Sequence, residues 1–267
     1  MVRALLVLSA AAVLTTGAAR GACLVDDFST DPFASRWYRS HSSITWDSAN
    51  QEIDFSGASG VYPWAVYKTP LSETTEQWMQ IKMTGSLGEV RAFLRKDAVT
   101  TDNNYYDLKS TKGNYAGNAY DQIVNVRGGS AWRLSRMWGQ VPDTDWIGFQ
   151  VTGTGETGTR FKFWACGVAP CGGVDWDDPS KWGTPDWDYS RGTGWVNAPI
   201  DSGPYIGIRF GGGPGAYSFQ EVRGGGVNCN AGGGGSPPRR VILVTKALER
   251  IVPAQMEDLT WFVTSPW

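Results

Sequence analysis

Tryptophan and aspartate alternate along one long segment of the chain, residues 166–203, which we call the tryptophan segment. Aromatic faces stack on the apolar C–H face of a pyranose, and carboxylates accept hydrogen bonds from sugar hydroxyls. The segment also exceeds ordinary connections between strands, which is typical of a functional loop or a small subdomain. We therefore expect a carbohydrate site here, with the candidate residues Trp176, Trp182, Trp187, Trp195, Asp186 and Asp188.

The same segment has a structural interpretation that the sequence does not separate from the first. Its tryptophans could form a small core of their own, with aspartates capping turns beside glycine and proline. The aspartates could also bind Ca²⁺ through oxygen ligands, although the chain has no complete twelve-residue calcium loop with a closing glutamate. Ca²⁺ is the one cofactor that the sequence suggests, and the metal content stays open.

A second candidate lies on the polar side of a strand predicted over residues 89–97 and of the following residues 103–109. Arginine and tyrosine on an open sheet face suit an acidic or hydroxyl-rich glycan. The alternative is a solvated sheet surface that carries cross-strand ion pairs. The polar residues concerned are Arg91, Arg95, Asp97, Asn104, Tyr105 and Asp107, of which Arg95, Asn104 and Tyr105 join the predicted carbohydrate-binding set.

Catalysis is not supported by any motif. Retaining glycoside hydrolases need two carboxyl groups held about 5 Å apart, and no Glu-x-Asp-x-Glu pattern occurs in the chain. A polysaccharide lyase would need a base, together with Arg or Gln to neutralise a uronate. Tyr105, Arg91 and Gln122 are residues of these types, but the sequence does not predict how they lie relative to one another. The single histidine, His41, is expected on the surface. No catalytic residue is assigned, and a glycan-degrading enzyme stays the alternative to a binding module.

Short runs in which apolar and polar residues alternate indicate strands along most of the chain. The clearest runs are Gln77–Thr84, 90–95, 147–151, 160–163, Tyr205–Phe210 and 217–222. The glycine-rich residues 211–215 separate the last two runs and predict a hairpin between them. Many short strands with frequent turns predict a two-sheet sandwich or a barrel.

Several blocks of the sequence together follow a known order. They are residues 26–29 followed by Trp37, residues 146–153 followed by 160–164, and residues 202–210 followed by 217–222. In this order they resemble the concanavalin A-like lectin/glucanase superfamily and its laminin-G-like jelly-roll domains, with Gln220 as a departure. The resemblance covers residues 24–224 and implies an all-β, two-sheet antiparallel sandwich. Because such domains include lectins, adhesion modules and enzymes, the resemblance does not select a function.

Residues 1–22 have the pattern of a signal peptide, with Arg3 at a charged start, an apolar stretch and a small-residue end. An exported chain with four cysteines favours two disulfides, and three pairings are possible. We favour Cys166 with Cys171, which closes a tight loop, and Cys23 with Cys229, which ties the first strand to the last. The protein is therefore expected to be secreted, to the periplasm or the exterior.

The expected organisation is a signal peptide over residues 1–22, a lectin-like domain over 23–229, and a linker with a β-prone tail over 230–267. The tail could mediate self-association, as in an extracellular assembly protein. A net charge of −2 without a long basic run argues against nucleic acid, and no segment has the roughly 20 apolar residues of a membrane span. The sequence predicts a secreted module that binds a polysaccharide or glycoconjugate.

Overall fold

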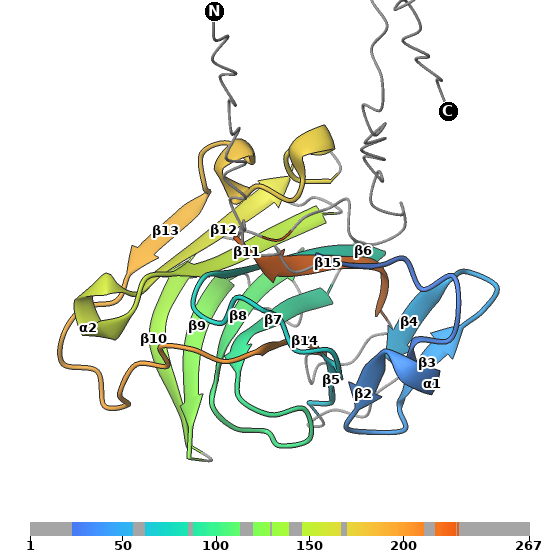
Figure 1. Ribbon diagram of the computed structural model, residues 1–267, viewed down its shortest axis with the longest axis horizontal. Coiled ribbons are helices and arrows are strands. Elements are labelled where there is room, and N and C mark those ends of the chain that lie inside the picture. Colours follow the sequence, from blue (N-terminus) through green and yellow to red (C-terminus); the bar gives the residue numbers. More distant parts are fainter. Residues whose placement is uncertain are drawn as a thin grey trace, which may run out of the picture.

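The computed structural model describes residues 23–55, 62–84, 88–112, 120–128, 130–138, 146–166, 170–210, 217–227 and 229. Two antiparallel sheets pack face to face, so the predicted all-β sandwich is confirmed (Figure 1). The signal peptide and the tail lie outside the described residues and stay predictions. In the part of the chain that is described, no helix is both long enough and apolar enough to cross a membrane.

The larger sheet has eight strands in the order β13-β12-β11-β6-β15-β4-β3, with β1 paired to β15. Its strands are β1 (Leu24–Asp26), β3 (Ile44–Asp47), β4 (Glu52–Phe55), β6 (Gln77–Thr84), β11 (Trp146–Thr152), β12 (Arg160–Cys166), β13 (Trp187–Ser190) and β15 (Tyr217–Gly226). β11 pairs with β12, from Trp146 opposite Cys166 to Thr152 opposite Arg160.

The smaller sheet has seven strands in the order β10-β9-β8-β7-β14-β5-β2. They are β2 (Trp37–Arg39), β5 (Trp64–Tyr67), β7 (Gly88–Lys96), β8 (Tyr105–Lys112), β9 (Tyr120–Arg127), β10 (Ser130–Trp138) and β14 (Tyr205–Phe210). The helical elements are single turns: α1 (Pro32–Ser35), α2 (Gly155–Gly158), and the 3-10 turns η2 (Gly173–Asp175) and η3 (Pro179–Lys181).

The main core fills the space between the sheets with alternate residues of each strand. Met79, Ile81 and Met83 of β6 point inward and are almost completely buried, as the alternation predicts. Full burial of each such side chain stabilises the fold by about 1.5–3 kcal/mol. The opposite face of β6 was expected to be half-exposed, but Gln80 there is fully buried because the tryptophan segment covers it.

The predicted hairpin across residues 211–215 is wrong. β14 pairs with β5 and β7 in the smaller sheet, whereas β15 pairs with β1, β4 and β6 in the larger one. The Phe210 and Phe219 rings stack 4.8 Å apart. Alternation shows that both strands bury one face, but a glycine-rich connection can cross between sheets as well as turn within one, so the sequence does not assign the sheet.

Both predicted disulfides, Cys23–Cys229 and Cys166–Cys171, are confirmed. The first joins the start of β1 to the chain just after β15, and these two strands also pair directly. The second closes a short loop at the start of the tryptophan segment, where β12 ends. In Figure 1 this segment begins with the gold turns beyond the ends of β11 and β12.

Candidate functional site

The outer face of the smaller sheet carries a hollow of about 380 Å³, which we call the sheet hollow. Antiparallel pairing brings its side chains together, because Arg91 lies opposite Lys109 on one side and Arg209 on the other, and Lys109 lies opposite Gln122. Residues opposite one another in adjacent strands project from the same face. The lining residues are Tyr62, Glu89, Arg91, Lys109, Gln122, Val124, Ala131, Arg133 and Arg209.

Ion pairs fix most of the charged groups of the sheet hollow. Arg91 binds Asp107 through two atoms, with Nε 3.0 Å from Oδ1 and Nη2 2.5 Å from Oδ2. Glu89 contacts both Lys109 and Arg91. Burial opposes the charge of Arg91, but the nearby Asp107 and Glu89 outweigh it and raise the pKa of Arg91 above its usual value. These side chains therefore form a rigid, charged floor.

Tyr105 lies at the edge of this floor and is almost completely buried. Its hydroxyl donates to Asp102 and accepts from Arg209 Nη1 at 3.0 Å. Burial raises the pKa of this phenol above its usual value. The neutral hydroxyl, already bonded on both sides, is therefore a poor general base.

Three side chains on the open side of the sheet hollow are less constrained. Tyr62 is 49% exposed, and the Arg91 and Arg209 guanidinium carbons each lie 5.9 Å from its ring centroid. Gln122 is only 9% exposed, yet its amide makes no hydrogen bond with another described residue. Arg133 is exposed and likewise has no ion pair or hydrogen bond among the described residues. The sheet hollow thus combines a fixed floor with an accessible ring, an amide and a guanidinium.

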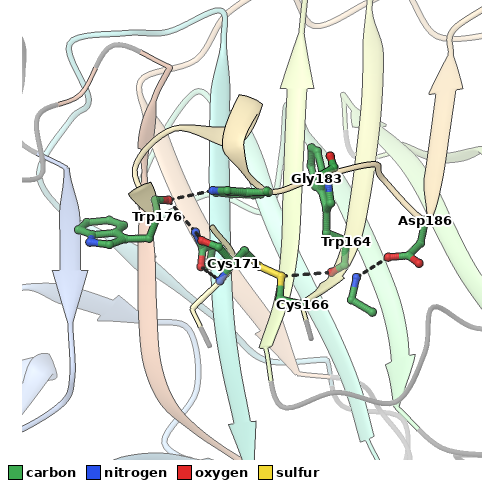
Figure 2. Close-up of a disulfide and its surroundings, with 9 residues drawn as sticks. Trp164, Cys166, Cys171, Trp176, Gly183 and Asp186 are labelled. Atoms are coloured by element: carbon green, nitrogen blue, oxygen red, sulfur yellow. Dashed lines mark hydrogen bonds between the residues drawn. A yellow bond between two sulfur atoms is a disulfide. The ribbon is translucent and has the colours of Figure 1, made fainter. Parts of the chain in front are cut away.

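The tryptophan segment, by contrast, forms a small core of its own on the larger sheet. Trp182 is 9% exposed and packs edge-on against Trp78 and Trp164, with ring centroids 5.4 and 5.1 Å apart. Figure 2 shows Trp164 and Trp176 beside the Cys166–Cys171 disulfide.

Gln80 of β6 fastens the segment to the sheet. Its Nε2 donates to the Trp176 carbonyl at 2.7 Å, and its Oε1 accepts from the Cys171 backbone N–H at 2.9 Å. The indole of Trp182 also donates to the Trp176 carbonyl, at 3.0 Å. Because these hydrogen bonds satisfy the Gln80 amide, its burial leaves neither its donor nor its acceptor without a partner.

The other predicted residues of the segment also have structural contacts. Trp176 lies under the Arg223 guanidinium, 4.6 Å from its ring centroid, and Trp187 of β13 packs on Phe163 at 4.8 Å. Trp195 packs against the main core, Asp186 accepts from the Ala165 N–H at 2.7 Å, and Asp188 pairs with Arg160. A hollow of about 390 Å³ beside the disulfide has Trp182 and Lys181 in its lining.

Arg95 and Asn104 do not line the sheet hollow. Arg95 has a left-handed backbone with φ 56° near the end of β7, and its fully buried guanidinium donates to the carbonyls of Thr75, Gly153 and Ile200. It braces loops and is not available to a ligand. Asn104 donates to Asp97 and lines a separate hollow of about 290 Å³. The predicted set is therefore divided among three places, and only Tyr105 borders the sheet hollow.

The sequence analysis did not name most of the residues that line the sheet hollow. Among the polar ones, Tyr62, Glu89, Lys109, Arg133 and Arg209 were not named as candidates, whereas Gln122 was considered only for lyase chemistry. Alternation gave a usable signal for Arg209, which lies between the buried Ile208 and Phe210 of β14. Alternation does not predict the order of strands in a sheet, and it is this order that places β14 beside β7.

An acidic cluster lies at the β3–β4 hairpin, where carboxylate oxygens of Asp47, Glu52 and Asp54 come within 4.8 Å of one another. Asp47 already accepts from the backbone N–H of Ala49 and the side chain of Asn50, which lower the pKa of its carboxyl. Asp54 accepts from Ser218 Oγ at 2.5 Å. None of these acids belongs to the predicted carbohydrate-binding set.

No protein-family model matches the sequence, and no curated protein matches it. Among solved structures, the chain is similar to a Bacillus subtilis protein of unknown function with a galectin-like fold, at a TM-score of 0.52 and 9% identity over 79% of this chain and 99% of that one. This chain has the lectin-like jelly-roll fold.

Two further similar structures are a CBM2 module and the carbohydrate binding module CBM66. The CBM2 module of the evolved Dit protein of Lactobacillus casei BL23 phage J-1 has a TM-score of 0.47 and 14% identity, over 79% of this chain and 98% of that one. The module CBM66 from Bacillus subtilis has a TM-score of 0.43 and 12% identity, over 70% and 92%. At such identities the likeness concerns the jelly-roll fold alone, so function has to be argued from the site.

Proposed function

We propose that this jelly-roll protein is a secreted saccharide-binding module and that the sheet hollow is its binding site. The observation that carries the proposal is the combination, in one surface hollow, of the exposed Tyr62 ring with hydrogen-bonding groups held in fixed positions. A pyranose has an apolar face for the ring and hydroxyls that both donate and accept hydrogen bonds. The two kinds of group in the sheet hollow match the two kinds of sugar surface.

Pre-organisation supports the same function. Arg91, Lys109 and Arg209 are held by carboxylates before any ligand arrives. Fewer rotamers are then lost when a ligand binds, and that loss costs about 0.5–1.5 kcal/mol for each flexible side chain. The Gln122 amide can donate and accept at once, which suits a sugar hydroxyl.

The proposal moves the predicted site from the tryptophan segment to the smaller sheet. Trp182 and Asp186, two of the first candidates, are occupied in packing and backbone bonding. Secretion rests on the predicted signal peptide and is supported by the two disulfides, which persist in oxidising compartments.

A glycan array probed with the full chain, with and without Ca²⁺, tests this function. We expect a defined set of saccharides to be retained and Tyr62→Ala to weaken their binding several-fold to tenfold, because stacking contributes about 0.5–1.5 kcal/mol. Trp132→Ala is the matched control: Trp132 is 44% exposed on β10, but adjacent strand residues point to opposite faces, so it projects away from Arg133.

Three outcomes would count against the proposal. Retention of no saccharide removes it, and equal binding by the wild type and Tyr62→Ala moves the site elsewhere. The release of reducing ends or unsaturated products from a polysaccharide would make the protein an enzyme. Loss of binding on Ca²⁺ removal would add a metal to the site, in which case Asp54→Asn shows whether the β3–β4 acidic cluster holds it.

A further inference from the structure

The sheet hollow has an excess of positive charge in a protein whose net charge is −2. Four of its lining residues are cations, Arg91, Lys109, Arg133 and Arg209, and Glu89 is the single acid among them. Asp102 and Asp107 form ion pairs with these cations, so the hollow and its surroundings contain three acids in total. One cation therefore remains without a counter-charge.

The unmatched cation is Arg133. Arg91 pairs with Asp107, Lys109 with Glu89, and Arg209 with Asp102 at 2.8 Å. Arg133 has no such partner among the described residues, and a lining side chain beside it, Gln122, is also without a hydrogen bond there although it is nine-tenths buried. An amide that makes no bond within the described residues and lines an open hollow is free to bond a ligand.

Strand pairing brings these two groups to the same side of the sheet hollow. Arg133 of β10 lies opposite Val124 of β9, and Gln122 is two residues along β9 on the same face, which makes the pair diagonal neighbours. The β9–β10 register shifts between Arg133 and Ser135. Such bulges redirect side chains and are frequent near functional sites.

We propose that the saccharide is anionic and that Arg133, with the Gln122 amide, binds its carboxylate or sulfate group; this inference rests on the proposed saccharide-binding function. A guanidinium presents two parallel N–H donors to two oxygens of such an anion, and the amide N–H adds a third donor. The sugar ring that carries the anion then lies toward Tyr62, which lines the same hollow.

The test uses an array on which sialylated, uronate-containing and sulfated glycans stand beside their neutral parents. The best-bound acidic glycan and its neutral parent are then titrated with the full chain by calorimetry. We expect the acidic member to bind at least roughly tenfold more tightly, because hydrogen bonds to charged groups are worth about 1.5–3 kcal/mol. The preference should shrink as salt is added.

Two variants at the site and one control complete the design. Arg133→Gln should remove the acidic preference, and Arg133→Lys should restore only part of it because an ammonium lacks the two-pronged geometry. Lys68→Gln removes one exposed cation from another place, after β5, and should change affinity less than about twofold. Arg133 is exposed, so these variants should fold, which a thermal melt verifies.

The outcomes separate this inference from the function on which it rests. Retention of no saccharide would remove both. Retention of neutral parents as tightly as acidic glycans, or an acidic preference that survives Arg133→Gln, would overturn the anionic ligand and leave the saccharide-binding function in place. An equal loss in Lys68→Gln would also overturn it, because the attraction would then come from net charge. Comparison of the carboxylate-containing glycans with the sulfated glycans on the array shows which anion is bound.

Discussion

The tryptophan segment and the sheet hollow contain similar residue types but use them in opposite ways. In the tryptophan segment, indole rings pack on one another and aspartates bind backbone N–H groups or Arg160. In the sheet hollow, most charged groups are fixed by each other, and the Arg91 and Arg209 guanidinium groups also lie over the half-exposed Tyr62 ring. The Gln122 amide and the Arg133 guanidinium make no hydrogen bond or ion pair with another described residue. A residue type that suits a ligand can bind one only where the protein leaves part of its ring face or of its hydrogen-bonding groups unused.

The largest effect that separates the two regions should come from Trp182→Ala. Removing this buried ring leaves a cavity between Trp78, Trp164 and the disulfide, which should lower the free energy of unfolding by about 3–5 kcal/mol. Saccharide affinity of the folded protein should stay unchanged. Denaturant unfolding and calorimetric titration measure the two quantities.

Trp187→Ala is the control for that variant, because Trp187 is only partly buried and should cost less stability. A Trp182→Ala protein of normal stability that no longer binds saccharide would return the site to the tryptophan segment.

Arg91→Met should disturb the sheet hollow itself. Asp107 is 1% exposed and would lose its two-atom partner, retaining only Arg209 at 3.7 Å. Breaking a buried pair from one side costs about 3–5 kcal/mol, so both stability and saccharide binding should fall. Arg133→Gln, which breaks no pair, should change the free energy of unfolding by less than about 0.5 kcal/mol. Equal stability losses in the two variants would contradict this division between floor and open side.

A double Cys166→Ser, Cys171→Ser variant should have a smaller effect. The disulfide closes a loop of sequence separation 5, and a loop that short is worth about 2 kcal/mol in the chain-entropy model. Urea unfolding should show that loss, while the glycan array should give the wild-type pattern. Loss of binding without a stability change would implicate the hollow beside the disulfide as the ligand site.

The sequence predicted most of the fold because alternation reports which residues face the core. The β6 strand, with its inward Met79, Ile81 and Met83, agrees with its predicted bounds, and both disulfides were placed correctly. The sheet assignment of β14 and β15 was not predictable, since alternation is the same in either sheet. The sheet hollow was not predicted for a related reason: Arg91 and Arg209 become neighbours only through the strand order.

Arg95 shows a second limit of the pattern. Its place in the alternating run suggested an outward side chain. The positive φ of Arg95 near the strand end instead directs its guanidinium into the protein, where it donates hydrogen bonds to backbone carbonyls. Non-glycine residues rarely adopt this backbone conformation, so the residue type does not predict it. Tyr105 is almost completely buried, and its hydroxyl is occupied by Asp102 and Arg209.

The smallest expected effect concerns Lys96, which ends β7 beside the floor of the sheet hollow. Its ammonium lies 4.8 Å from the Tyr105 ring centroid and 5.1 Å from that of Trp64. Burial lowers the pKa of Lys96 from 10.5 to about 8. Between these two values the unfolded chain keeps a proton that the folded protein has released, so the free energy of unfolding should rise with pH.

Guanidinium unfolding at pH 7.5 and pH 9.5 measures this rise, in a window below the ionisation of unfolded tyrosines near pH 10. Lys96→Met should remove it, because the variant has no proton to release at this position, and the free energy of unfolding of the wild type relative to the variant should therefore be higher at pH 9.5 than at pH 7.5. Parallel pH dependence in both proteins would mean that Lys96 titrates normally. The tryptophan segment provides the matched comparison: Lys181→Met removes an exposed lysine there and should leave the pH dependence of the wild type intact.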